Sequence, residues 1–168
     1  MIFGPDEPSL GPEMFALSDS EHLLVWTWRR IAAGRGDCPL IPREFARACG
    51  EDAAEVFVTF STFLRALGCA SRRLLRVGAP GSASLTRDER QLLSVIAAAQ
   101  AGDAVRGEAH LRWLARAALR HALANAANAL GAALAAHGHW LPQPDPMAPV
   151  TRAQRPPVLI RSRFSASS

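Results

Sequence analysis

The most regular pattern of apolar and polar positions runs from residue 52 to residue 67. At about 100° per residue of a helix, six large apolar side chains in this stretch fall on one arc, while Thr59, Thr62 and Arg65 fall outside it. The six are Val56, Phe57, Phe60, Phe63, Leu64 and Leu67. We expect a helix with the most apolar face of the protein. Because such a face must be buried, we expect the other helices to pack around it.

Two further helices are predicted before this stretch. The first spans 19–33 and opens with Ser18 and Glu21, which have the spacing of a capping box. The second is short, spans 42–49 and ends at Gly50. The positions predicted to face the core are Leu24, Val25, Trp28, Ile31 and Ala32 in the first helix, and Phe45, Ala46 and Cys49 in the second.

The order of helix, short helix, tight turn and longer helix is that of a helix-turn-helix unit. In such a unit the helix at 52–67 would read DNA, yet its start carries Glu51, Asp52 and Glu55, whose carboxylates would repel phosphate. It also has no arginine before Arg65, so direct base readout lacks its usual donors. We therefore interpret the N-terminal half as helix-turn-helix-like in architecture only.

The pattern becomes irregular after Gly68. Residues 72–86 hold Arg72, Arg73 and Arg76 among leucine and valine, followed by a glycine- and proline-containing break. One interpretation is a short hairpin, the basic wing of a winged-helix protein, whose arginines would contact phosphate. The other is a basic linker whose leucines fill the core, and both interpretations stay open.

Two helices are predicted in the second half of the chain. The first opens with a capping box formed by Thr86 and Glu89 and ends at Gly102; the second begins at 103 or 108 and runs unbroken to 136. The short turn between them implies antiparallel neighbours. Their predicted inner positions are Leu92, Leu93, Val95, Ile96 and Ala99, then Leu111, Ala115, Ala118, Leu119, Ala122, Ala126, Leu130 and Ala133.

Two tryptophans are candidate partner-binding residues. Trp26 projects from the polar side of the first helix, beside Arg29, where it is either an interaction anchor or covered by the N-terminal arm. On the last helix, arginines recur every four residues at Arg112, Arg116 and Arg120, and Trp113 lies near the last two, so a cation–π contact is available. This Arg-Trp stripe would either grip phosphate or acidic side chains, or form a plain solvated face.

Proline-rich segments bound the predicted domain. We expect an extended arm over 1–17, a helical domain over 18–141 and a disordered Pro/Arg-rich tail over 142–168. Arg161 and Arg163 in the tail join the arginines of the linker as candidate anion or nucleic-acid contacts.

Composition and charge narrow the class of protein. An apolar fraction of 49% and a charged fraction of 20% in 168 residues are ordinary for one globular domain. All 19 basic residues are arginine, a bias typical of a GC-rich bacterial genome. The net charge of +4 divides into −5 for 1–60, from 5 arginines and 10 acids, and +9 for 61–168, from 14 arginines and 5 acids. Such a basic half attracts nucleic acid, anionic lipid or an acidic protein.

The chemistry that would indicate an enzyme is missing from the sequence. There is no glycine-rich phosphate loop, no nucleophile elbow and no histidine pair with metal-ligand spacing, and the three cysteines have no disulfide or zinc pattern. We expect no cofactor, no metal and no catalysis. An N-terminus without a signal-peptide pattern and the lack of a long uninterrupted apolar run favour a cytoplasmic location without a membrane span.

The sequence therefore predicts an all-α bundle of about five helices. The predicted function is a non-enzymatic interaction module that binds a protein partner or self-associates. The alternative is a winged-helix-like nucleic-acid-binding regulator that uses the basic linker and the tail.

Overall fold

The computed structural model describes residues 14–143, which are mainly helical and contain no named β-strand. Its helices are α1 (Asp19–Ala32), α2 (Leu40–Cys49), α3 (Ala53–Ala70), α4 (Arg87–Gln100), α5 (Ala104–Leu114) and α6 (Arg120–Ala136), with short 3₁₀ turns η1 (Met14–Ala16), η2 (Gly50–Asp52) and η3 (Ala117–Leu119). The prediction of an all-α bundle is confirmed. Most of the expected arm and of the expected tail, including Arg161 and Arg163, lies outside the described residues.

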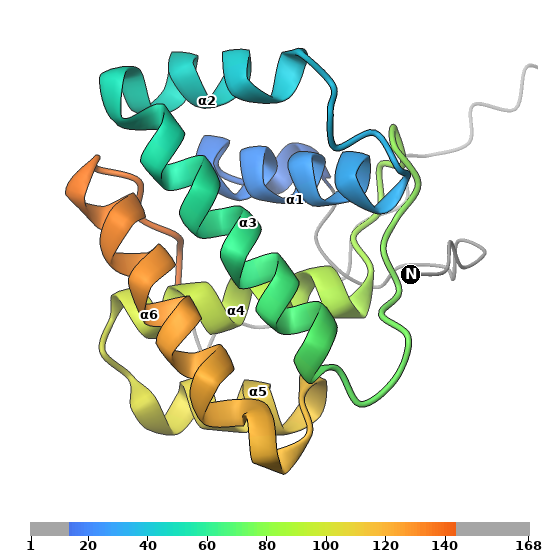
Figure 1. Cartoon of the computed structure of the whole chain (residues 1–168), viewed down its shortest axis with the longest axis vertical. Helices are drawn as coiled ribbons and strands as arrows, with labels where there is room; N and C mark the ends of the chain where they lie inside the picture. The colour runs from blue at the N-terminus through green and yellow to red at the C-terminus, as the bar shows by residue number, and fades with distance from the viewer. Residues whose placement is uncertain (1–13, 144–168) are drawn as a thin grey trace, which may run out of the picture.

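Helix α3 crosses the centre of the bundle, with α2 and α6 packed directly against it (Figure 1). The predicted apolar face is confirmed, since five of its six residues are buried: Val56, Phe60, Phe63, Leu64 and Leu67. Phe57 is partly buried and meets Phe45 of α2 edge to face, with ring centroids 5.2 Å apart. Helix α4 packs against α5 and α6 and completes the core.

Both predicted capping boxes are present. The Ser18 hydroxyl accepts from the Glu21 amide, and the Glu21 carboxylate accepts from the Ser18 amide at 2.9 Å. Thr86 and Glu89 make the same reciprocal pair at the start of α4. These bonds satisfy amides that a helix start leaves without partners, which explains why both helices begin where predicted.

Helix α2 begins earlier than predicted, at Leu40, and its inner residues are Ile41, Phe45 and Cys49. Ala46 was predicted to face the core and is exposed, which corrects that assignment. The three buried residues follow one another at intervals of four, and Ala46 lies one residue, about 100°, away from that row.

The helix predicted to run unbroken to 136 is divided into α5 and α6, which corrects the prediction. Ala115 has φ −119° and ψ 151°, an extended conformation, and forms an isolated antiparallel bridge with Ser71. The Arg72 amide donates to the Leu114 carbonyl at 3.1 Å, and the Arg116 amide donates to Ala70 at 2.9 Å. Backbone groups that would continue the helix are therefore bonded to the segment that follows α3.

The break also changes which side of the last helix is buried. The buried residues of α6 are Leu123, Ala127, Leu130, Gly131 and Leu134. Ala118 and Ala122 were predicted to face the core and are exposed. The face extrapolated from α5 is therefore wrong at Ala118 and Ala122, because the extended residues between the helices reset the helical phase. Leu130 is buried as predicted, and Ala126 and Ala133 are partly buried against the core.

The segment 72–86, for which a hairpin was one possibility, is an irregular loop without a strand. Leu75 and Val77 within it are buried, as a linker that fills the core requires.

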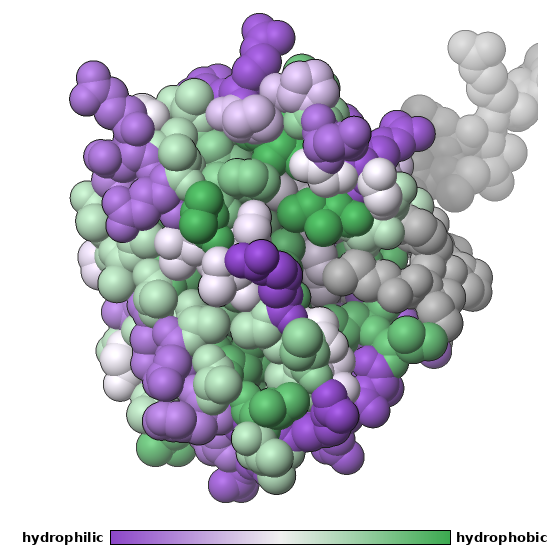
Figure 2. All heavy atoms as spheres, viewed as in Figure 1, coloured by the Kyte–Doolittle hydropathy of each residue, from purple (hydrophilic) through white to green (hydrophobic). Residues whose placement is uncertain are grey.

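α3 and α6 lie on the side of the molecule that faces the viewer in Figure 1. On this side, hydrophilic side chains stand mainly at the rim, and weakly apolar residues predominate in the middle (Figure 2).

One helical run, Leu40–Ala70, is long and apolar enough to cross a membrane by length and composition. That criterion is weak, because core helices of water-soluble proteins pass it as well. The run contains the turn η2 and supplies the buried face of α3.

Candidate functional site

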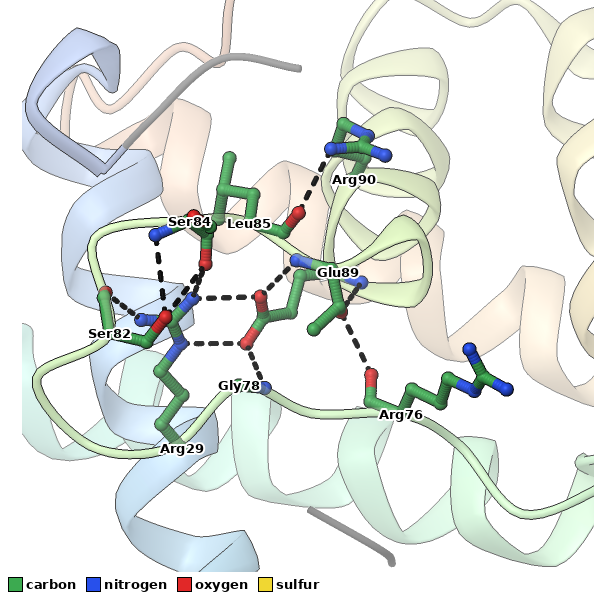
Figure 3. A network of polar contacts seen from close by, with 9 residues as sticks. Arg29, Arg76, Gly78, Ser82, Ser84, Leu85, Glu89 and Arg90 are labelled. Atoms are coloured by element: carbon green, nitrogen blue, oxygen red, sulfur yellow. Dashed lines mark hydrogen bonds and ion pairs between the residues drawn. The ribbon is translucent and has the colours of Figure 1, made fainter. Parts of the chain in front are cut away.

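The loop that carries the candidate arginines is fixed by a buried ion pair (Figure 3). Arg29 of α1 and Glu89 of α4 are 2% and 0% exposed, and the Arg29 Nε lies 2.7 Å from the Glu89 Oε1. The same guanidinium donates to the carbonyls of Ser82 and Ser84 at 2.6 Å each. Glu89 accepts from the Gly78 amide at 3.0 Å. Two charges thus hold both limbs of the loop, and each has its hydrogen bonds satisfied.

Helical periodicity missed this network. Arg29 was predicted on the polar side of its helix beside Trp26, and the structure corrects this by burying it among loop carbonyls. Gly78 provides the necessary space, because a Cβ at that position would lie 2.7 Å from the Arg29 Nη2. The interpretation of Glu89 as a cap is confirmed but incomplete, since its carboxylate also binds Arg29.

A second ion pair fixes the loop to the start of α4. Asp88 is 1% exposed, and its two oxygens accept from the Arg73 guanidinium at 2.6 and 2.7 Å and from the Arg76 amide at 2.7 Å. Burial alone would raise the pKa of Asp88, but the bonds from Arg73 and Arg76 outweigh it and hold that pKa below its ordinary value. The bond to Asp88 in turn raises the pKa of Arg73. Arg73 is therefore a structural residue as well as a surface charge.

Trp113 lies beside these loop residues. The Arg87 guanidinium lies 3.8 Å from the centre of the Trp113 ring, and that of Arg73 lies 5.9 Å from it. The predicted stripe with Arg116 and Arg120 is wrong, because the chain breaks its helix between Trp113 and both arginines. The Arg116 side chain donates to the Cys69 carbonyl instead, and Arg120 pairs with Glu108 at 2.6 Å.

We call the resulting surface the basic face. It comprises six exposed arginines and two exposed apolar side chains from the loop after α3, the start of α4 and the end of α5. The members are Arg72, Arg73, Arg76, Arg87, Arg112, Arg116, Leu74 and Trp113. Leu74 is 59% exposed and Trp113 is 41% exposed. Six arginines against the carboxylates of Asp88 and Glu108 leave a net charge of +4 on this face.

Several of these arginines are oriented by neutral partners. Arg72 donates to the Arg112 carbonyl at 3.0 Å, and Arg116 donates to the Cys69 carbonyl. A carbonyl positions a guanidinium without cancelling its charge, so both remain able to attract an anion. Glu108 accepts from Arg112 and from Arg120, and these bonds lower its pKa.

Trp26, the other candidate aromatic residue, does not belong to the basic face. It is half-buried and packs against the core, with the Arg30 guanidinium 4.5 Å from its ring centre. Leu74 and Arg87 belong to the face and were missed as site residues, whereas Arg112 was part of the predicted stripe. No local signal identifies Leu74 or Arg87, because the neighbours on this face come from distant segments, as in the contact of Arg87 with Trp113.

Two histidines after α6 have structural partners in the N-terminal half of the chain. His139 lies 3.0 Å from the Ser20 hydroxyl through Nδ1 and 2.9 Å from the Ala48 carbonyl through Nε2, and so ties the end of the domain to α1 and α2. His137 lies 3.6 Å from Asp52. Within residues 14–143, no group of three or more histidine, cysteine or acidic side chains is placed to hold a metal ion.

No protein-family model, curated protein or solved structure significantly matches this chain, so its surfaces are interpreted from their own chemistry.

Proposed function

We propose that this protein is a non-enzymatic interaction module that binds an acidic segment of a partner protein through the basic face. The observation that carries the proposal is the presence of six exposed arginines on three linked segments, two of which, Arg73 and Arg87, lie over the exposed Trp113 ring. Arginine and tryptophan are the side chains most enriched among residues that dominate protein–protein binding. A partner segment that alternates acidic and apolar residues would match both parts of this surface.

The geometry favours binding because the basic face is already ordered. The ion pairs of Asp88 with Arg73 and of Glu89 with Arg29 fix the loop, and backbone carbonyls orient Arg72 and Arg116. A preorganised surface loses less conformational entropy on association. The planar guanidinium can also engage a carboxylate through two parallel hydrogen bonds, which adds geometric selectivity.

Fluorescence anisotropy with a labelled peptide of alternating glutamate and leucine tests the proposal on the full chain. We expect Arg87→Gln and Trp113→Ala each to weaken binding by about tenfold, the usual effect of losing a dominant interface residue. Arg43→Gln is the matched control, since Arg43 is exposed on α2, far along the chain from the basic face. Undetectable binding at low salt, or an equal loss in the control, would reject the proposal.

Nucleic acid is the second candidate ligand, favoured by the half-exposed Trp113 ring beside arginines. Such a ring can stack on the bases of a single strand while the arginines contact phosphate. Nucleic acid would bind neither a wing nor a reading helix in this alternative. The loop lacks the strands of a wing, and the exposed carboxylates of Glu51, Asp52 and Glu55 at the start of α3 would repel phosphate.

The same anisotropy assay with a random single-stranded oligonucleotide separates the two ligands. Phosphate-driven binding should weaken by orders of magnitude between about 50 and 200 mM salt. Oligonucleotide binding tighter than peptide binding, with that salt dependence, would replace the acidic protein as the favoured partner. Sedimentation velocity on the same sample reports whether the protein self-associates.

A further inference from the structure

The N-terminal segment of this chain, residues 1–13, has the composition that the basic face is proposed to bind. Its sequence contains three carboxylates, Asp6, Glu7 and Glu13, and no arginine, so its side chains sum to a charge of −3. Large apolar side chains stand on both sides of the first two acids, at the start of the segment and at Leu10. The basic face, with a net charge of +4 and two exposed apolar side chains, complements this segment in both respects.

The structure brings the end of this segment close to the basic face. The next residue of the chain is Met14, whose amide donates to the Ala83 carbonyl at 2.7 Å. Ala83 belongs to the loop that carries Arg72, Arg73 and Arg76, and it precedes Arg87 by four residues. Because consecutive Cα atoms are about 3.8 Å apart, the Cα atoms of Met14 and Arg87 are at most about 22 Å apart.

The N-terminal segment is long enough to cover that distance. Asp6 and Glu7 precede Met14 by eight and seven residues. At about 3.3 Å per residue of extended chain, they reach up to about 26 and 23 Å from it, and the long arginine side chain shortens the remaining gap. The other segment outside the described residues, 144–168, contains four arginines and one acid, so its charge of +3 would be repelled by the same face.

We infer that the N-terminal segment occupies the basic face of its own chain and competes there with the acidic partner. The inference rests on the proposed function, because it treats this segment as an internal counterpart of that partner. A segment tethered by a short linker has an effective concentration on the order of millimolar, so even weak contacts give substantial occupancy. The partner binds only molecules whose basic face is unoccupied, and its apparent affinity is reduced by that fraction.

Peptide binding to the full chain tests this competition. The double variant Asp6→Asn/Glu7→Gln removes two carboxylates from the N-terminal segment. We expect it to bind the peptide of alternating glutamate and leucine about three- to tenfold more tightly than the wild type at low salt. The matched control is Glu51→Gln/Glu55→Gln, which changes the net charge equally at exposed positions near the start of α3, whereas the loop of the basic face follows its end. Equal affinities of the double variant and the wild type, or the same gain in the control, would overturn the inference and leave the proposed function in place.

Nuclear magnetic resonance measures the contact without the peptide. The chain has four tryptophans, and Trp113→Phe identifies the indole N–H signal of Trp113. We expect that signal to move in Asp6→Asn/Glu7→Gln and to stay in place in the control. An unmoved signal would overturn the inference, as would a signal that shifts with protein concentration, which would place the segment on a second molecule. If the peptide binds neither protein and the signal moves, the proposed function fails and the basic face serves the N-terminal segment alone.

Discussion

At the residue scale, the most important feature is a charge pair that the hydrophobic pattern does not predict. Arg29 and Glu89 stand 60 residues apart, and each lies on a helix where a charged side chain is expected to face solvent. Their burial is compatible with folding because the two charges bond to each other and to backbone groups of the loop. Removing one partner would leave a buried charge without compensation.

Glu89→Gln should therefore destabilise the fold strongly. Breaking a buried ion pair from one side costs about 3–5 kcal/mol, whereas an exposed pair contributes about 1 kcal/mol or less. The free energy of unfolding, measured by urea denaturation, is compared with that of Glu44→Gln. Glu44 pairs with Arg47 at 2.9 Å on the surface of α2 and provides the exposed control. Similar small losses in both variants would show that the buried pair does not hold the loop.

Asp88 predicts a dependence of stability on pH. Its pKa in the folded protein lies below the ordinary value of about 3.9, so folding stabilises the ionised form. The contribution is fully present above that ordinary value and is lost as the pH falls through the lower pKa of the folded state. We expect the free energy of unfolding to fall between neutral and strongly acidic pH, and to fall less in Asp88→Asn. Parallel pH profiles for the two proteins would contradict the assignment.

At the scale of the element, the break between α5 and α6 is imposed from outside the helices. The residues around it are Ala115, Arg116, Ala117 and Ala118, all good helix formers without glycine or proline. The bridge from Ala115 to Ser71 and the bonds of the flanking amides compete with the helix and prevail. Because local propensity is a weak preference, tertiary hydrogen bonds override it.

Ala117→Pro tests this break directly. Arg116 has φ −65° and ψ 142°, which suits the residue before proline, and Ala117 is the first residue of η3, where a missing amide costs little. We expect the melting temperature to stay unchanged or to rise slightly, because proline restricts the unfolded chain. Ala129→Pro, at an exposed position in the middle of α6, should cost about 3 kcal/mol or more. Comparable loss in both variants would indicate a continuous helix in solution.

At the scale of the whole molecule, the core is organised as the α3 pattern predicts. Phe60 and Phe63 are fully buried, and α2 and α6 pack directly against their helix. Large apolar side chains on one arc of a helix can be removed from water only by other elements that pack on that arc. The central position of α3 in the core therefore follows from the sequence of this one segment.

Phe60→Ala should accordingly destabilise the protein by about 3–5 kcal/mol, since it removes a large buried side chain and leaves a cavity. Val58→Ala on the same helix is the control, because Val58 is 60% exposed and surface substitutions usually change stability by less than about 0.5 kcal/mol. Chemical denaturation of both variants provides the comparison. A small effect at Phe60 would mean that α3 is not the centre of the core.

The candidate site was predictable only in part. Arg72, Arg73, Arg76, Trp113 and Arg116 were named from the sequence, but as members of separate features. Their meeting on one face depends on the antiparallel bridge between Ser71 and Ala115, which has no periodic signature in either segment. The same bridge explains why the expected neighbours of Trp113 were wrong.

The sequence by itself determined what depends on neighbours within one or two helical turns: the all-α class, both capping boxes and the buried face of α3. Only the tertiary structure decided the burial of Arg29, the break between α5 and α6, and the grouping of arginines around Trp113. The physical reason is the range of the interactions. Capping and amphipathicity act along a few residues, whereas these three features require groups from distant segments to come together, 60 residues apart in the case of Arg29 and Glu89.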